Sequence, residues 1–377
     1  MVGSGIKLGR IFGIPIYLHS SWFIIFALIT ISLATQFASQ HPHWSQTQHW
    51  SVGIITSLLF FGSVLFHELA HSVVAQRYRI PVVSITLFVF GGLARIGREP
   101  ASARQEFQIA VAGPVSSYVL AIGFWLLTRV FRSSEMLGAL TGWLAQINFA
   151  LATFNLAPGF PLDGGRILRA VAWAMTGSYA RATRFASRGG QVLAYAMIVA
   201  GIWQSLTRNL SGGLWLAFIG WFLLTAAQES YAQVAIREAL RGLRAADVMS
   251  PELPTVGREL SLEDYAHEVL RTGRRCHLVV AEGQLKGMMT VHGLNRIAHE
   301  DWPRTSVQAA MKPREQIHWV APEEPLLSLL ERMQGEDINQ VPVVAEGTPG
   351  RVVGMVTRES ILHVIQTHAE VGELAGQ

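Results

Sequence analysis

The sequence predicts a polytopic α-helical membrane domain with about six spans and a small membrane-associated β element, followed by a soluble α/β domain. Half of the 377 residues are hydrophobic and only 15% are charged, a balance typical of membrane proteins. Charge is unevenly distributed, because residues 1–243 contain 17 Lys/Arg and 7 Asp/Glu, whereas residues 244–377 contain 13 and 19. The two regions are therefore expected to lie in different solvents.

Six apolar stretches have about the 17–25 residues that a bilayer-spanning helix needs. They cover residues 15–37, 51–76, 107–130, 137–157, 190–207 and 213–233. Basic residues gather in alternate connections, so the positive-inside rule predicts that both termini are cytoplasmic. The expected location is the plasma membrane, as an integral protein. The first run is expected to remain as a span and not to be a signal peptide, because no small-residue cleavage site follows it.

The predicted domains are a membrane domain at 1–237, a linker at 238–246 and a cytoplasmic domain at 247–377. The expected surroundings of the first domain are a lipid bilayer. Its excess of basic residues contains no stripe with interleaved aromatic residues, so no nucleic-acid partner is expected.

The segment PVVSITLFVFGGLARIG, residues 81–97, lies between the second and third spans. It is rich in β-branched and aromatic residues and too short to cross a bilayer as a helix, which favours strands. A hairpin at membrane depth would have to pack on protein or border a watery cavity. The alternative is an ordinary cytoplasmic loop.

The stretch FHELAH, residues 66–71, places two histidines and a carboxylate in apolar sequence. His67 and His71 are four positions apart, so on a helix they share one face and could bind one zinc ion through imidazole nitrogens. Glu68, next to that face, is a candidate general base that takes a proton from metal-bound water and passes it to a leaving amine. The alternative is a hydrogen-bonded histidine pair with an interfacial glutamate.

A catalytic zinc site needs a third protein ligand and an open position. Apart from Glu68, Asp163 is the acidic residue of the first 243 that lies against deeply apolar sequence, within FNLAPGFPLDGGRIL. Prolines and glycines break the helix there, and broken backbone near a membrane is tolerated where it is buried in protein or lines a cavity. Asp163 is therefore a candidate ligand; the alternative is a cap for the helix that begins near Gly165.

FHELAH together with FNLAPGFPLDGGR resembles the site-two protease family of intramembrane zinc metalloproteases, over roughly residues 1–235. The resemblance implies His67, His71 and Asp163 as ligands of one Zn²⁺ per chain, with Glu68 as the catalytic base.

The same resemblance implies a core of three helices, which end at Glu68, cross at Gly113-Pro114 and end at Asn155. Asn148 and Asn155 would then line the active site and hold the extended substrate or the oxyanion. The alternative for both amides is hydrogen bonding between helices.

A substrate helix hides its carbonyl groups in internal hydrogen bonds, so it must unwind locally before hydrolysis. The expected partner is a single-span membrane protein or a signal peptide with helix-weakening residues near the scissile bond. The β-like segment 83–97 could pair with the unwound chain by strand addition.

The C-terminal region contains a repeat of about 60 residues, at about 247–300 and 307–366. DVMSP at 247–251 is echoed by AAMKP at 309–313, and GMMT at 287–290 by GMVT at 354–357. This order resembles a tandem pair of cystathionine-β-synthase (CBS) domains, which implies a clefted unit that binds an adenosine nucleotide.

Thr290 and Thr357 are the candidate nucleotide-binding residues of this CBS pair. The ribose-binding Asp of the family is replaced by Gly293 and Ser360, so the alternative is a ligand-free module that forms a homodimer through its CBS domains. Members with this architecture imply that the module adjusts access to the membrane site.

Two other functions remain consistent with these residues: a CBS-regulated ion transporter whose His and Asp bind the permeating ion, and a non-proteolytic scaffold. Exchange of Glu68 for glutamine distinguishes them, because hydrolysis should nearly vanish while a transport site would keep partial function and a scaffold would be unaffected.

Overall fold

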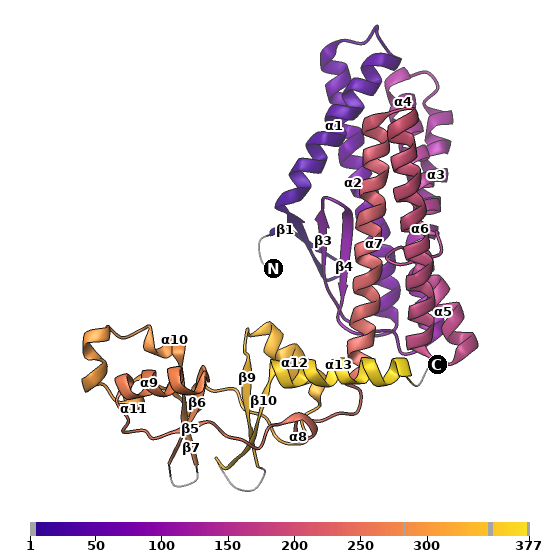
Figure 1. The fold of residues 1–377 in the computed structure, drawn as a ribbon. Coiled ribbons are helices and arrows are strands. Elements are labelled where there is room, and N and C mark those ends of the chain that lie inside the picture. The colour runs from indigo at the N-terminus through magenta and orange to yellow at the C-terminus, as the bar shows by residue number, and fades with distance from the viewer. Residues whose placement is uncertain (1–4, 282–283, 346–349, 375–377) are drawn as a thin grey trace. The chain divides into compact units, whose positions relative to one another are not determined.

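The computed structural model describes residues 5–281, 284–345 and 350–374, with side chains described as far as residue 367 (Figure 1). The chain divides between Val234 and Ala235 into two compact units. Each unit has its own hydrophobic cores, and each is considered by itself. Residues up to Ala239 continue the last membrane helix, so helix extends two residues into the segment predicted as a linker.

Seven helices build the first unit from residue 5 onward, where its description begins. They are α1 (Ser20–Gln40), α2 (Gln46–Arg77), α3 (Ala103–Val130), α4 (Glu135–Asn155), α5 (Asp163–Thr176), α6 (Tyr179–Thr207) and α7 (Leu210–Ala239). All except α5 are long and apolar enough to cross a membrane, which confirms the prediction of six spans. Many of their exposed side chains are large and apolar, as expected where the surrounding solvent is hydrocarbon.

Two span boundaries were predicted wrongly. The first helix begins at Ser20 and not at residue 15, because residues 14–19 form a strand in which buried and less buried side chains alternate. A window of hydropathy does not resolve that two-residue period. The fifth span, α6, begins at Tyr179 and not at residue 190, because a face of small residues between its three arginines, among them Ala182, Thr183 and Ala186, packs inward.

A four-stranded sheet accompanies the helices, with strand order β1-β2-β3-β4. The strands are β1 (Gly5–Ile11), β2 (Ile14–His19), β3 (Val82–Phe88) and β4 (Gly91–Ile96). The hairpin β3–β4 confirms the strands predicted at 81–97, whereas β1 and β2 were not predicted. β2 and β3 are parallel and are joined through α1 and α2, so their pairing could not be read from local sequence.

The sheet packs on protein rather than forming a free loop. Ile14, Ile16 and Ile85 from its inner face form a buried cluster with Leu69 of α2. At the turn of the hairpin, Phe90 stacks on Phe222 of α7 with ring centroids 4.0 Å apart. The strands β3 and β4 therefore lie next to the helix that carries FHELAH (Figure 1).

The second unit contains two sheets of small size. The first has the order β5-β6-β7-β8 and the second pairs β9 with β10. Their strands are β5 (Thr255–Val256), β6 (Cys276–Ala281), β7 (Gln284–Thr290), β8 (Lys312–Pro313), β9 (Gln340–Val344) and β10 (Val352–Thr357). The helices are α8 (Ala245–Val248), α9 (Leu262–Thr272), α10 (Val291–Leu294), α11 (Val307–Ala310), α12 (Leu326–Gly335) and α13 (Arg358–Leu374), with 3₁₀ turns η1 (His299–Arg304) and η2 (Arg314–Gln316).

The sequence repeat corresponds to a structural repeat. β6 and β7 form an antiparallel hairpin followed by α10, and β9 and β10 form one followed by α13. The leading methionines are exchanged: Met249 lies against Gly354, and Met311 lies against Gly287. A Cβ on Gly354 would stand 2.5 Å from the Met249 sulfur, and one on Gly287 would stand 2.4 Å from the Met311 sulfur. The glycine of each repeat therefore leaves space for the methionine at the start of the other repeat.

Candidate metal centre

Helix α2 brings the two histidines of FHELAH to one face, one turn apart. His67 and His71 are 5% and 4% exposed, although imidazole is a polar group that needs partners when buried. Both rings find them on α3. His71 Nδ1 donates to the carbonyl oxygen of Ile109 at 2.6 Å, and His67 Nδ1 lies 2.9 Å from the hydroxyl of Ser117.

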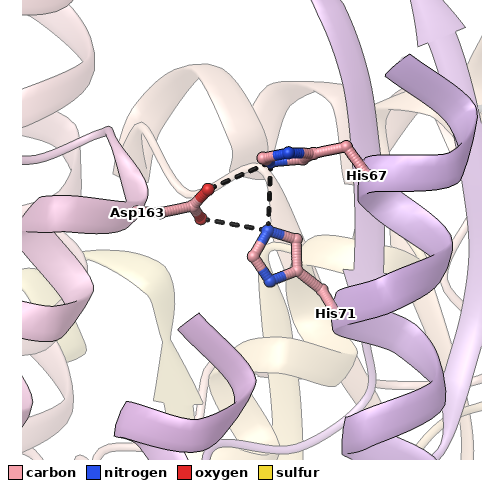
Figure 2. A group of neighbouring side chains, drawn as sticks. All are labelled: His67, His71 and Asp163. Atoms are coloured by element: carbon pink, nitrogen blue, oxygen red, sulfur yellow. Dashed lines mark hydrogen bonds and ion pairs between the residues drawn. The ribbon is translucent and has the colours of Figure 1, made fainter. Parts of the chain in front are cut away.

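These contacts determine what the Nε2 atoms can do. A carbonyl oxygen only accepts hydrogen bonds, so the proton of a neutral His71 ring is on Nδ1 and its Nε2 carries a free electron pair. Partners of this kind fix the tautomer and the orientation of metal-binding histidines. In both rings, Nε2 points toward the third candidate residue (Figure 2).

Asp163 is the first residue of α5 and follows the broken segment between α4 and α5. The cap position of α5 is occupied by Leu162, and no side-chain hydrogen bond caps the helix. The alternative role predicted for Asp163, a helix cap, is therefore not the one observed. Instead its carboxylate is directed at α2, 96 residues earlier in the sequence (Figure 2).

Glycines allow the segment before Asp163 to fold tightly. A Cβ on Gly164 would lie 2.3 Å from the carbonyl oxygen of Ala157, and one on Gly165 would lie 2.3 Å from the carbonyl carbon of Gly159. The backbone NH of Phe160 donates to the carbonyl oxygen of Ala186 on α6 at 3.2 Å. The irregular segment is thus buried in protein at Gly159, Phe160 and Leu162, where backbone at membrane depth needs protein partners.

The three side chains converge with the spacing of a metal site. His67 Nε2 lies 3.0 Å from Asp163 Oδ2, His71 Nε2 lies 3.2 Å from Asp163 Oδ1, and the two Nε2 atoms are 3.2 Å apart. Ligand atoms about 2.0 Å from a tetrahedral zinc ion are separated by about 3.3 Å. The donor set also fits zinc, because two imidazole nitrogens and one carboxylate are common ligands of its catalytic sites.

Helix α3 can approach the histidines only because Gly113 has no side chain. A Cβ there would lie 2.1 Å from Nε2 of His71 and 2.7 Å from Cε1 of His67. No heavy atoms approach so closely without one of them moving. Gly113 is therefore part of the wall of the site, and it faces Nε2 and Cε1 of His71 and Cε1 of His67.

The side chain of Glu68 extends from α2 toward β4 of the sheet. A Cβ on Gly92 of β4 would stand 2.4 Å from Cγ of Glu68 and 3.1 Å from its Oε1. The carboxylate makes no hydrogen bond to another of the described residues and is half-buried. Glu68, the candidate base, is thus held by packing against Gly92, and both of its carboxylate oxygens remain available to accept a proton.

Replacing Gly92 with alanine is expected to displace the Glu68 carboxylate without touching the histidines. A shift of about 1 Å in a catalytic group can lower the rate about a hundredfold. We expect peptide cleavage to fall by that order while the zinc content stays at the wild-type level. Gly62→Ala on α2 is the matched control, because no atom beyond the neighbouring helix backbone lies within 4 Å of the added Cβ. Equal cleavage by both variants would contradict the placement of Glu68.

The two asparagines predicted to line the site differ in their surroundings. Asn148 is fully buried, and its amide nitrogen donates to Ser63 Oγ at 3.2 Å and to the carbonyl oxygen of Leu144 at 2.8 Å. Both amide hydrogens are therefore used, which favours the alternative of a hydrogen bond between helices. Asn155 ends α4 and is half-buried, and it makes no side-chain hydrogen bond to another described residue.

The two threonines predicted to bind a nucleotide act as local caps. Thr290 Oγ1 accepts from the backbone NH of Gly293 at 3.3 Å, and Thr357 Oγ1 accepts from that of Ser360 at 3.0 Å. Gly293 and Ser360 occupy the positions where a ribose-binding aspartate is expected. Nearby, burial raises the pKa of the Cys276 thiol to about 12, so this thiol is protonated and unreactive at neutral pH.

Sequence reasoning missed the residues that orient the candidate ligands. Ile109, Gly113 and Ser117 are spaced by four residues and so lie on one face of α3, where each contacts a histidine. The spacing of Gly113 and Ser117 is a small-residue pattern typical of closely packed membrane helices, and it could have indicated this face. The contact of Gly92 with Glu68 had no signal in the sequence.

Comparison with known families gives two matches. The model of peptidase family M50 matches residues 55–137 and 132–197, and the CBS domain model matches residues 307–367. The first match contains both FHELAH and Asp163. The second covers the later of the two repeats.

Individual relatives match most of the chain. The protein sll0528 of Synechocystis is 35% identical over 98% of this chain and 97% of its own length. Rip3 of Mycobacterium tuberculosis is 35% identical over 96% and 93%. Both are named as zinc metalloproteases, as is MJ0392 of Methanocaldococcus jannaschii, which is 31% identical over 77% of this chain and 79% of its own. Among solved structures, the site-2 protease from Methanocaldococcus jannaschii is 30% identical, covering 60% of this chain and 95% of that one, with a TM-score of 0.42.

Proposed function

The chain belongs to peptidase family M50, the site-2 protease family, and is a zinc metalloprotease with a CBS domain, from which we propose that it cleaves membrane-anchored substrates within or near their transmembrane segment. The convergence of His67, His71 and Asp163 carries this proposal, because their spacing suits one zinc ion at membrane depth. In the proposed site these three residues are the zinc ligands. A bound zinc ion would polarise the scissile carbonyl group and activate water for attack.

The protein's own residues perform the remaining steps of the proposed reaction. Glu68 accepts a proton from the attacking water and transfers it to the nitrogen of the leaving amine, which is the general acid–base role of a positioned carboxylate. Ser117 and the Ile109 carbonyl keep the two imidazoles in position throughout. Asp163 is the most exposed of the ligands, with 13% of its side chain accessible, so water is expected to approach from its side.

The substrate is proposed to enter as an unwound segment. Hydrolysis needs a free carbonyl group, and a transmembrane helix supplies one only where its hydrogen bonds have opened. β4 is at one edge of the sheet, beside Glu68 through Gly92. An extended substrate added to this edge would replace its lost helical hydrogen bonds with bonds to β4. This position favours substrates with Gly or Pro near the scissile bond over uniformly helical ones.

The protein is an integral membrane protein, and we propose that it lies in the plasma membrane. The distribution of its basic residues supports a cytoplasmic position for both termini. The CBS repeats, which would then be cytoplasmic, are proposed to adjust cleavage. An adenosine nucleotide and a homodimer formed through these repeats remain proposals of the same kind.

The test uses the full chain in lipid vesicles with single-span peptides. One peptide carries Gly and Pro in the middle of its span, and a matched peptide carries Leu and Ala. We expect one zinc ion per chain by elemental analysis, and cleavage of the first peptide only. Cleavage should stop in chelator and return with added zinc; parallel reactions with and without ATP test the CBS repeats. Absence of bound zinc, or cleavage that continues without it, would refute the proposal.

A further inference from the structure

A buried ion pair joins α3 to α5 outside the metal-binding triad. Arg169 on α5 donates from Nε to Oε1 of Glu106 on α3 at 2.7 Å, and a second guanidinium nitrogen contacts the same oxygen. The Glu106 side chain is 0% exposed and that of Arg169 is 9% exposed. Two charges removed from water in this way are costly and are seldom the most stabilising solution for a core.

The arginine contacts more than its carboxylate. Its guanidinium carbon lies 4.8 Å from the ring centre of Phe160 and 4.6 Å from that of Tyr179. Tyr179 in turn donates its hydroxyl to Glu99 at 2.6 Å. One side chain therefore joins α3, the start of α6 and the irregular segment that precedes Asp163. Phe160 lies only three residues before that ligand.

One of the two carboxylate oxygens of Glu106 lacks a hydrogen-bond partner among the described residues. That oxygen, Oε2, is buried. A buried polar atom without a partner destabilises the folded state. An apolar pair of similar volume would avoid this cost. Stability alone therefore does not explain why charged side chains occupy this position.

Both elements joined by the pair contribute to the metal centre. Glu106 lies on the helix whose Ile109 carbonyl orients His71 and whose Gly113 faces both imidazoles. Arg169 lies on the helix that begins with Asp163. The histidines and Asp163 come from sequence positions 96 and 92 residues apart, so an additional connection between α3 and α5 would fix their separation.

We propose that Arg169 and Glu106 are positioning residues, which hold Asp163 at binding distance from the two histidines. The proposal rests on the proposed zinc site. In this role the rigid guanidinium fork of Arg169 binds Glu106 on α3 and stacks on Phe160, and these contacts fix the position of the segment that leads to Asp163. Neither residue is expected to contact the substrate.

The test separates zinc retention from folding stability. Arg169→Met leaves the buried Glu106 carboxylate without its hydrogen-bonding partner, and Glu106→Met leaves the Arg169 guanidinium with only its longer ion pair, 4.0 Å from Glu99. Both single variants should therefore melt at lower temperature than the wild type. The double variant should recover the melting temperature, because two apolar side chains replace the pair. Zinc release to a chelator, measured with a colorimetric indicator in the absence of substrate, should stay faster by about tenfold or more in the double variant.

Two further variants make the result decisive. Arg169→Lys keeps the charge but loses the fork and the stacking, and it should fold normally yet release zinc faster. Arg184→Met removes a guanidinium from Tyr231, where it lies 5.6 Å from the ring centre on the α6–α7 side, and it should release zinc at the wild-type rate. If the double variant does not fold, Arg169→Lys decides the question.

Zinc release at the wild-type rate in Arg169→Lys and in the folded double variant would overturn the positioning role. That result would leave the proposed function intact as long as the wild type holds zinc and cleaves. If the wild type itself binds no zinc, the proposed function fails, and this is seen before any variant is measured.

Discussion

Replacing Glu68 with glutamine is expected to lower the rate of peptide cleavage about a thousandfold while zinc stays bound. General acid–base catalysis by a positioned side chain contributes about 10²–10⁴ to the rate. Glutamine has the same shape as glutamate, so it fits against Gly92, but it cannot accept the proton of the attacking water. None of the three atoms that converge on the metal position belongs to Glu68, so the zinc content should not change.

The measurement is single-turnover cleavage of a single-span peptide in vesicles, with zinc determined on the same sample. Glu229→Gln is a matched control, because Glu229 is an exposed residue of α7 in the same unit. Its cleavage rate should equal that of the wild type. Partial activity of Glu68→Gln in ion flux across the vesicle membrane would instead favour a transporter, and unchanged cellular behaviour would favour a scaffold.

The parts of this molecule that were predictable from sequence depend on local periodicity or composition. Long apolar runs are sufficient for helices in a bilayer, and the four-residue spacing of His67 and His71 is sufficient to place them on one helical face. The hairpin β3–β4 was predictable for a similar reason, since β-branched residues end at two adjacent glycines. Family membership confirms the zinc metalloprotease predicted from these residues.

The parts that were not predictable depend on pairs of residues that are distant in the sequence. The strands β1 and β2 form because β2 lies beside β3, which begins more than 60 residues later. Residues 15–19 are apolar enough for a helix, so hydropathy alone assigned them to the first span. Likewise, the contact of Arg169 with Glu106 spans 63 residues, and no local pattern distinguishes either residue from a charge at a helix end.

Gly113 is the residue outside the proposed zinc-binding triad whose substitution should have the largest effect on zinc binding. Replacing it with alanine places a carbon 2.1 Å from Nε2 of His71 and 2.5 Å from its Cε1. The ring is held from behind by the Ile109 carbonyl, so it cannot withdraw without losing that hydrogen bond. Either α3 moves outward or the imidazole rotates away from Asp163. Both responses separate the proposed ligands, and we expect zinc affinity to fall by about a hundredfold.

Elemental analysis of the purified protein, with cleavage of the same peptide, measures this effect. Asp163→Ala serves as the positive control for loss of zinc. Gly123→Ala is the matched control on the same helix, since no atom beyond the neighbouring helix backbone lies within 4 Å of the added carbon, and alanine favours the helix by about 0.5–1 kcal/mol. Zinc bound to Gly113→Ala as tightly as to Gly123→Ala would mean that the imidazoles do not face α3. In that case the orientation of Nε2 toward Asp163, on which the tetrahedral fit depends, would also be wrong.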